Sequence, residues 1–212
     1  MKPCVVIGAG GHSRSLCSLL KSSKEYRPLM VIDLHYSGKS EDILGLKVEG
    51  VKDALSQDLR KAGVEHLFLA IGGNREREEL FLDLKNQGFV FPTFIAGTAV
   101  KKEGVVYGEG NIVFDKAYIG PLVRMGSNNI LNTASIIEHE CLIGDHCNIG
   151  PGSVISGRAT IGNHVFVGTS ATVIDKVSIS SFVTLGAGAV VVKDINEPGT
   201  YIGVPARIKK EG

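Results

Sequence analysis

The sequence lacks the features of a membrane or secreted protein. Its 212 residues contain no tryptophan, and aromatic residues make up 6%. No apolar run approaches the roughly 20 residues that a helix needs to cross a bilayer. The start of the chain, MKPCVVIGAGGH, reaches glycine too early for a secretory signal. We therefore expect a cytoplasmic protein that does not insert into membranes.

Cysteine is also scarce. The four cysteines, Cys4, Cys17, Cys141 and Cys147, stand in apolar or repetitive surroundings without CxxC spacing. The cysteines of disulfide frameworks and zinc sites usually stand at closer and more regular spacing. We expect four small buried side chains and no bound metal.

Neither half of the chain carries an excess of one charge. The net charge is +1, with 15 basic and 13 acidic residues up to Gly104 and 8 and 9 after it. Nucleic-acid binders usually show a basic patch or stripe, so this class is disfavoured. With 43% hydrophobic residues, the chain is long enough for one sizeable domain or two small ones.

The second half of the sequence repeats every six residues. One phase of this period is aliphatic or methionine throughout: Val113, Ile119, Met125, Leu131, Ile137, Ile143, Ile149, Ile155, Ile161, Val167, Val173, Ile179, Leu185 and Val191. The position four residues further on is mostly small or β-branched. Neither the 3.6-residue period of a helix nor the 2.0-residue period of a strand keeps this phase. A hexapeptide repeat predicts a parallel β-helix, in which stacked coils bury a shared core.

The first hundred residues alternate between strand and helix patterns. KPCVVIGAGGHSRSLCSLL predicts a buried strand, a glycine turn and a helix from near Ser13, and LMVID and HLFLAIG predict further strands. This alternation favours a small parallel α/β sheet. The glycine turn suits a phosphate at the helix N-terminus. As an NAD fingerprint it is weak, because Ser13 replaces the third glycine.

Residues 107 to 207 resemble the left-handed β-helix acyltransferases, and GAGAVVVKDINEPGTYIGVPAR resembles their C-terminal signature. The resemblance implies triangular coils of three hexapeptides each, a homotrimer, and acetyl-CoA bound in the groove between coils. It places the cofactor-binding residues at Asn148, Thr169, Gly186, Ala187, Pro205 and Arg207. The last two are equally compatible with a hairpin that closes the end of the β-helix.

Together with IGAGGHSRS, VID and AIGGNREREEL, the repeat resembles the sugar acetyltransferases of the PglD and NeuD type over nearly the whole chain. We expect a Rossmann-like domain at 1–104 that binds a nucleotide sugar and a left-handed β-helix at 105–212. The resemblance implies substrate contacts from Gly10, Gly11, His12, Ser13, Asp33, Gly72, Gly73 and Asn74. His12 has a second interpretation, as a cap of the helix.

The sequence IEHEC contains the candidate base, His139. If one coil takes three hexapeptides, Gly157 follows His139 by one full coil and lies directly over it, about 4.8 Å along the axis. A histidine can take the proton of an attacking amine, and a bare backbone N–H can stabilise the oxyanion that forms. By resemblance, His139 is the general base, Glu140 orients it and Gly157 supplies the amide. The alternative for His139 is an exposed turn residue.

Three further positions of the repeat bear on the site, namely Asn148, His146 and His164. Several relatives have a second histidine where this chain has Asn148, which can donate a hydrogen bond to a thioester carbonyl but cannot take a proton. We expect His146 and His164 to face solvent, although His146 could line the cofactor groove.

The function that this resemblance implies is acetyl-CoA-dependent N-acetylation of the 4-amine of a UDP-linked 4-amino-4,6-dideoxy sugar for surface glycans. The alternatives are O-acetylation of sialic acid and N-acetylation of GDP-perosamine. A different class is a non-catalytic trimeric scaffold that senses nucleotide, which has no need of the set His139, Glu140 and Gly157.

Overall fold

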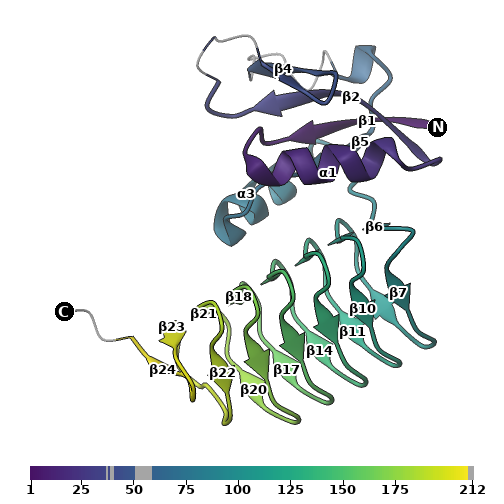
Figure 1. Cartoon of the computed structure of the whole chain (residues 1–212). Helices are drawn as coiled ribbons and strands as arrows, with labels where there is room; N and C mark the ends of the chain where they lie inside the picture. The colour runs from purple at the N-terminus through teal and green to yellow at the C-terminus, as the bar shows by residue number, and fades with distance from the viewer. Residues whose placement is uncertain (37, 39–40, 51–58, 210–212) are drawn as a thin grey trace. The chain divides into compact units, whose positions relative to one another are not determined.

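The chain folds into two compact units, Met1–Pro92 and Thr93–Gly212. They are seen in a computed structural model that describes residues 1–36, 38, 41–50 and 59–209 (Figure 1). Each unit has its own sheets and its own hydrophobic core.

The first unit is an α/β sheet of five strands in the order β3-β4-β2-β1-β5. Its elements are β1 (Lys2–Ile7), α1 (Gly11–Lys21), β2 (Tyr26–Asp33), β3 (Asp42–Ile43), β4 (Leu46–Gly50), β5 (His66–Leu69) and α3 (Asn74–Asn86). The pairs β1–β2, β1–β5 and β2–β4 are parallel, and β3 pairs with β4 in the antiparallel sense. The predicted parallel α/β sheet is confirmed, and α1 starts at Gly11, just before Ser13.

Successive side chains of β1 point to opposite faces of the sheet, and those on both faces are buried. Val5 and Ile7 belong to the cluster that includes Phe81 of α3. Cys4 precedes Val5 in sequence and is also fully buried. Strands buried on both faces are typical of parallel sheets covered by helices on either side. Because β1, β2 and β5 are parallel, their carboxyl ends meet at one edge of the sheet, where the loops before α1 and α3 begin.

The second unit is a parallel β-helix with three faces. Face 1 is an eight-stranded sheet: β6 (Phe94–Ile95), β9 (Ile112–Val113), β12 (Ile130–Leu131), β15 (Asn148–Ile149), β18 (Phe166–Val167), β21 (Val183–Leu185), β23 (Gly199–Ile202) and β24 (Arg207–Ile208). Face 2 has six strands: β7 (Val100–Lys101), β10 (Tyr118–Ile119), β13 (Ile136–Ile137), β16 (Val154–Ile155), β19 (Thr172–Val173) and β22 (Val190–Val191). Face 3 has five strands: β8 (Val106–Tyr107), β11 (Arg124–Met125), β14 (Leu142–Ile143), β17 (Thr160–Ile161) and β20 (Ser178–Ile179).

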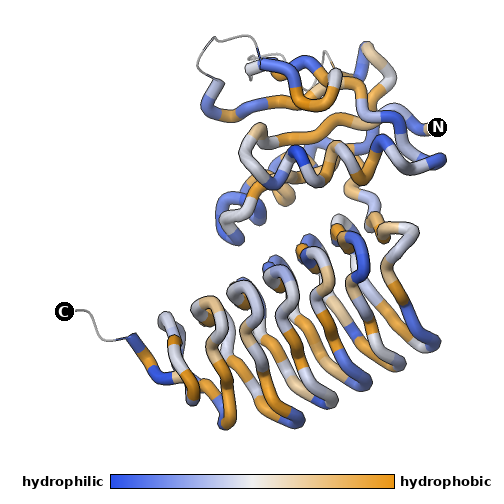
Figure 2. The backbone as a smooth tube through the Cα atoms, in the orientation of Figure 1, coloured by the Kyte–Doolittle hydropathy of each residue, from blue (hydrophilic) through white to orange (hydrophobic). Residues whose placement is uncertain are grey.

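The register of these sheets confirms the coil length. Ile136 pairs with Val154 and Ile137 with Ile155, an offset of three hexapeptides that recurs on all three faces. The second residue of each short strand points inward, and Ile137, Ile155 and Val173 are fully buried. Hydrophobic segments recur from coil to coil along the tube (Figure 2). The hexapeptide phase read from the sequence is therefore the phase of the core.

The β-helix begins earlier than the boundary expected at 104/105. Its first coil comprises β6, β7 and β8, so the two units divide between Pro92 and Thr93. In this coil Lys101 and Tyr107 occupy positions that carry aliphatic residues in later coils. The terminal coil has a neighbour on one side only, which relaxes the demand for an apolar side chain and hides the repeat.

In the parts of the chain that the structure describes, no helix is long and apolar enough to cross a bilayer.

Candidate active site

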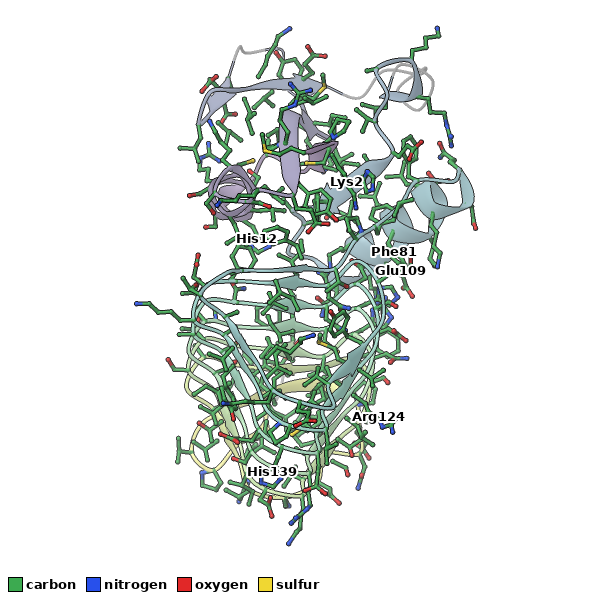
Figure 3. The ribbon with its side chains drawn as sticks, turned by 90° about the vertical axis from the view of Figure 1, so that its right-hand side faces the viewer. Lys2, His12, Phe81, Glu109, Arg124 and His139 are labelled. Atoms are coloured by element: carbon green, nitrogen blue, oxygen red, sulfur yellow. The ribbon has the colours of Figure 1, made fainter. Side chains whose placement is uncertain are left out.

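His139 and Glu140 lie at an edge of the β-helix, where the chain turns from face 2 to face 3. The turn follows β13 and precedes β14, and Figure 3 shows His139 at an outer edge of the coils. Glu140 has the left-handed φ of 58° that recurs at the β-helix corners. Both side chains are accessible, with exposed fractions of 42% and 43%. The corner thus presents an imidazole and a carboxylate to solvent.

Gly157 stacks on His139 in the next coil, as a coil of three hexapeptides predicts. The backbone N–H of Arg158 donates to the carbonyl oxygen of His139 at 2.9 Å. A Cβ atom added at Gly157 would lie 2.5 Å from Cε1 and from Nε2 of the imidazole. Among the described residues the N–H of Gly157 has no hydrogen-bond acceptor. Glycine therefore leaves room for the ring and an amide free to bind a ligand.

Glu140 accepts two hydrogen bonds on one oxygen. Its Oε2 lies 3.0 Å from Nδ1 of His139 and 3.1 Å from Nε of Arg158. The hydrogen bond with His139, and then the charge of Arg158, lower the pKa of Glu140 below its usual value. Because an ionised carboxylate only accepts hydrogen bonds, the neutral imidazole carries its proton on Nδ1. Nε2, the nitrogen beside Gly157, is left with a lone pair that can accept a proton.

Two residues at this corner were missed by the sequence prediction, namely Arg158 and Asp175. Arg158 follows Glu140 by one coil, and Asp175 follows Gly157 by the same interval. Oδ1 of Asp175 lies 3.1 Å from the position of a Cβ at Gly157. Gly157 is thus flanked by His139 on one side and Asp175 on the other. The interval that identified Gly157 would have found both residues.

The predicted cofactor residues lie elsewhere on the β-helix. Asn148 begins β15 on face 1, across the coil from the corner that holds His139, and it is 6% exposed. Thr169, Gly186 and Ala187 lie in turns between faces 1 and 2, which form a different corner. Within one chain the fold does not bring these residues to the His139 corner.

Pro205 and Arg207 belong to the C-terminal hairpin. β23 pairs with β24 in the antiparallel sense and closes face 1. A cavity of about 310 Å³ lies here, lined in part by Tyr201, Ala206 and Arg207. The guanidinium of Arg207 donates to the carbonyl of Ala206 at 2.8 Å.

The expectation that His146 faces solvent is wrong, because its exposed fraction is 8%. Its ring stacks on His164 with centroids 5.1 Å apart, and His164 stacks on Phe182 at 4.6 Å. The amide of Asn128 lies 2.9 Å from Nδ1 of His146. These four positions follow one another by one coil each, so the repeat brings their side chains into one column at the corner between faces 3 and 1.

The first unit contains a cavity of about 170 Å³ at the carboxyl edge of its sheet. It is lined by Gly8, Ala9, Gly10, Asp33, Leu34, His35, Ala70, Ile71 and Glu76. Gly10 and Asp33 were predicted to contact substrate, and Gly8 belongs to the glycine turn predicted to accept a phosphate, whereas His35 and Glu76 were not predicted. Gly8 has φ of 104°, and a Cβ there would meet the carbonyl oxygen of Ala70 at 2.8 Å. Only glycine lets β1 leave the sheet at this point.

The first turn of α1 supports this edge from inside. Gly10 is the N-cap residue and no side chain caps the helix, so the interpretation of His12 as a cap is wrong. Burial, and then the charge of Arg77, lower the pKa of His12 to about 4. Ser13 is fully buried and its hydroxyl donates to the carbonyl of Gly10 at 2.6 Å. Gly10 and Gly11 have open space where a Cβ would be.

The loop before α3 is fixed by a buried arginine that sequence reasoning missed. Arg77 is 1% exposed and donates to the carbonyl of Ile71 at 3.1 Å and to Oδ1 of Asn74 at 3.0 Å. Gly72 and Gly73 lie between these acceptors. The predicted positions Gly72, Gly73 and Asn74 thus form the N-terminus of α3, but they do not line the cavity.

The four cysteines are buried, as expected, and all four are free thiols. In the described residues no group of three or more His, Cys, Asp or Glu side chains is arranged to hold a metal ion.

The arrangement defines a class of protein: an α/β unit with an anion-compatible edge, joined to a β-helix that carries a His-Glu pair beside a glycine amide. Residues 4–84 match the PglD N-terminal domain family. Three of the similar solved structures match this chain over nearly the whole length of both chains.

PerB from Caulobacter crescentus, in complex with CoA and GDP-perosamine, has 34% sequence identity and a TM-score of 0.91, and the match covers 99% of this chain and 98% of that one. The acetyltransferase domain of PglB from Neisseria gonorrhoeae, in complex with acetyl coenzyme A, has 30% identity and a TM-score of 0.88, with coverage of 98% and 99%. WeeI from Acinetobacter baumannii has 25% identity and a TM-score of 0.87, with coverage of 99% and 100%. The chain belongs to the left-handed β-helix sugar acetyltransferases of the PglD and NeuD type.

Proposed function

We propose that this enzyme transfers the acetyl group of acetyl-CoA to the 4-amine of a nucleotide-linked 4-amino-4,6-dideoxy sugar, in the cytoplasm. The observation that carries the proposal is the stack at the corner between faces 2 and 3. There a ring nitrogen with a free lone pair lies beside a glycine whose N–H has no acceptor among the described residues. Acyl transfer from a thioester needs both groups.

In the proposed reaction the neutral amine attacks the thioester carbonyl. Nε2 of His139 takes the amine proton as the C–N bond forms, and the N–H of Gly157 stabilises the oxyanion. When the C–S bond breaks, the proton passes to the sulfur and CoA leaves as the thiol. Glu140 holds the imidazole through Nδ1 and stabilises the imidazolium that forms. A general base of this kind typically contributes 10²- to 10⁴-fold.

The nucleotide would bind at the carboxyl edge of the first unit. The open turn at Gly10 and Gly11 and the N-termini of α1 and α3 suit the diphosphate, with His12 and Gly72 to Asn74 nearby in sequence. Asp33, which lines the cavity, would accept hydrogen bonds from the base. Ser13 would act indirectly, since its hydroxyl already closes the turn.

Two nucleotides are candidates. UDP is the one that the family resemblance implies. GDP is favoured by two observations: PerB, at 34% identity, was solved with GDP-perosamine, and both Asp33 and Glu76 line the cavity. A carboxylate only accepts hydrogen bonds. Guanine offers two adjacent N–H donors, whereas the uracil edge has one donor between two carbonyl acceptors.

We further propose a homotrimer with its active sites between subunits. The separation of the candidate residues within one chain supports this, since Asn148 and the turns of Thr169 and Gly186 lie away from His139. A cyclic trimer lets one subunit present its His139 corner to another face of its neighbour. Asn148 would then donate to the thioester carbonyl, and the turns of Thr169, Gly186 and Ala187 and the hairpin of Pro205 and Arg207 would hold CoA. Exposed apolar residues such as Leu142 and Phe166 are available for such contacts.

The test is release of free thiol from acetyl-CoA against a panel of UDP- and GDP-linked amino sugars and free sialic acid, with wild type and His139→Ala side by side. We expect one class of nucleotide amino sugar to support turnover and His139→Ala to lose at least about 10²-fold. Near wild-type turnover by His139→Ala would overturn the mechanism. Turnover with sialic acid alone would overturn the substrate. No turnover with any acceptor, despite nucleotide binding, would favour the scaffold.

A further inference from the structure

Arg158 joins the candidate catalytic pair from the next coil. Its Nε lies 3.1 Å from the same Glu140 oxygen that Nδ1 of His139 contacts at 3.0 Å. The arginine side chain is 50% exposed. Exposed ion pairs of this kind contribute little to folding stability. Stability alone therefore does not explain the contact.

The contact fixes the direction of the carboxylate. Glu140 is itself 43% exposed, so a lone glutamate at this corner would sample several rotamers. Two donors on one oxygen, one from each of two stacked coils, restrict it to the orientation in which it faces Nδ1. Arginine suits this task because its planar guanidinium donates in a fixed direction.

The contact also changes the charge that the imidazole experiences. A carboxylate alone favours the protonated imidazole, which cannot act as a base. The positive charge of Arg158 offsets part of this effect. The two nitrogens lie at most about 6 Å apart, since both contact Oε2. In water, a unit charge at that range shifts a proton equilibrium by about 0.5 pH unit.

We propose that Arg158 is a positioning residue that orients Glu140 toward His139 and offsets part of the negative charge that Glu140 places beside the imidazole. This inference rests on the proposed role of His139. The other charged groups at the corner are Glu138 beside His139, Asp175 beyond Gly157, and Lys176, whose Nζ lies 3.5 Å from the Asp175 carboxylate. They are common to all the variants compared below, apart from Lys176 in its own control.

The experiment is the pH profile of kcat/KM between pH 5 and 9 for Arg158→Gln, Arg158→Lys and the matched control Lys176→Gln. Lys176 follows Arg158 by one coil, and its replacement removes the same charge without touching the Glu140 contact. We expect Arg158→Gln to move the acid limb up by about 0.3 to 0.5 pH unit and to lower kcat about 3- to 10-fold, with the KM for acetyl-CoA little changed. Arg158→Lys should restore the acid limb, and Lys176→Gln should move it by less than about 0.1 unit.

A variant of opposite sign completes the design. Glu140→Gln removes the negative charge and should move the acid limb down, away from the change caused by Arg158→Gln. The inference is overturned if the Arg158→Gln profile coincides with that of wild type or of Lys176→Gln. It is also overturned if Arg158→Gln lowers activity equally at every pH. Those outcomes leave His139 untouched, whereas an active His139→Ala would remove the base itself.

Discussion

Replacing Gly157 by alanine tests the geometry of the active-site corner with one methyl group. The added Cβ would lie 2.5 Å from Cε1 and Nε2 of His139 and 3.1 Å from Oδ1 of Asp175. Ordinary contacts of a Cβ begin at about 3.4 Å, so the imidazole must move by about 1 Å. The corner is open to solvent, and the ring has room to swing outward, away from the Glu140 oxygen that it contacts at 3.0 Å.

We expect this change to affect catalysis far more than stability. A displacement of about 1 Å in a reacting group can cost on the order of 10²-fold in rate. Alanine at an ordinary φ value restricts the unfolded chain, which favours folding by about 0.4 to 1 kcal/mol. That gain is similar in size to the loss of an exposed His-Glu contact. The melting temperature should therefore stay within about 3 °C.

The assay is thiol release under saturating acetyl-CoA, paired with thermal unfolding of the same samples. Gly97→Ala is the matched control, because it lies in the same unit with open space around its Cβ position. We expect Gly157→Ala to lose about 10- to 100-fold in kcat and Gly97→Ala to keep wild-type activity. Wild-type kcat/KM in Gly157→Ala would refute the reasoning, because the ring could not then need its present position.

Three other outcomes follow from the same structure. If each active site takes His139 from one subunit and Asn148 from its neighbour, mixed trimers of His139→Ala and Asn148→Ala subunits should regain about a quarter of wild-type activity. Thiol release that stays at the level of either parent would contradict shared sites. Burial lowers the pKa of His12 to about 4, so between pH 6.5 and 4 the unfolded chain binds more protons than the folded chain. The free energy of unfolding should therefore decrease as the pH is lowered through this range, by at most about 3 kcal/mol. Urea unfolding at pH 7 and 4.5 checks this, and an equal loss in His12→Gln would contradict it. Leu131→Ala in the β-helix core should cost about 2 to 5 kcal/mol of unfolding free energy, against less than about 1 for the exposed Leu122→Ala, as measured by urea titration.

Much of the β-helix could be predicted from the sequence. In a solenoid each coil contacts only its neighbours, so the spacing along the chain determines which residues stack. The interval of one coil placed Gly157 over His139, and the hexapeptide phase identified buried residues such as Ile137 and Ile155. The same interval would have led to Arg158 and Asp175 had it been applied to every candidate.

The first coil and His146 show the limits of that approach. Lys101 and Tyr107 interrupt the aliphatic phase of the repeat. The hexapeptide pattern therefore did not predict that the β-helix starts at β6. His146 was expected in solvent because a corner position in one hexapeptide is exposed when considered alone. Stacking on His164 and the contact with Asn128 bury it instead.

The sequence by itself determined the two fold types, the coil length and the stack of His139 with Gly157, because these depend on local periodicity. Only the tertiary structure decided that Glu140 shares one oxygen between His139 and Arg158, and that Arg77 is buried beneath the loop before α3. It also brought His35 and Glu76 to the cavity of the first unit. Such contacts depend on the direction of each side chain and on strands that are distant in sequence, and a period along the chain encodes neither.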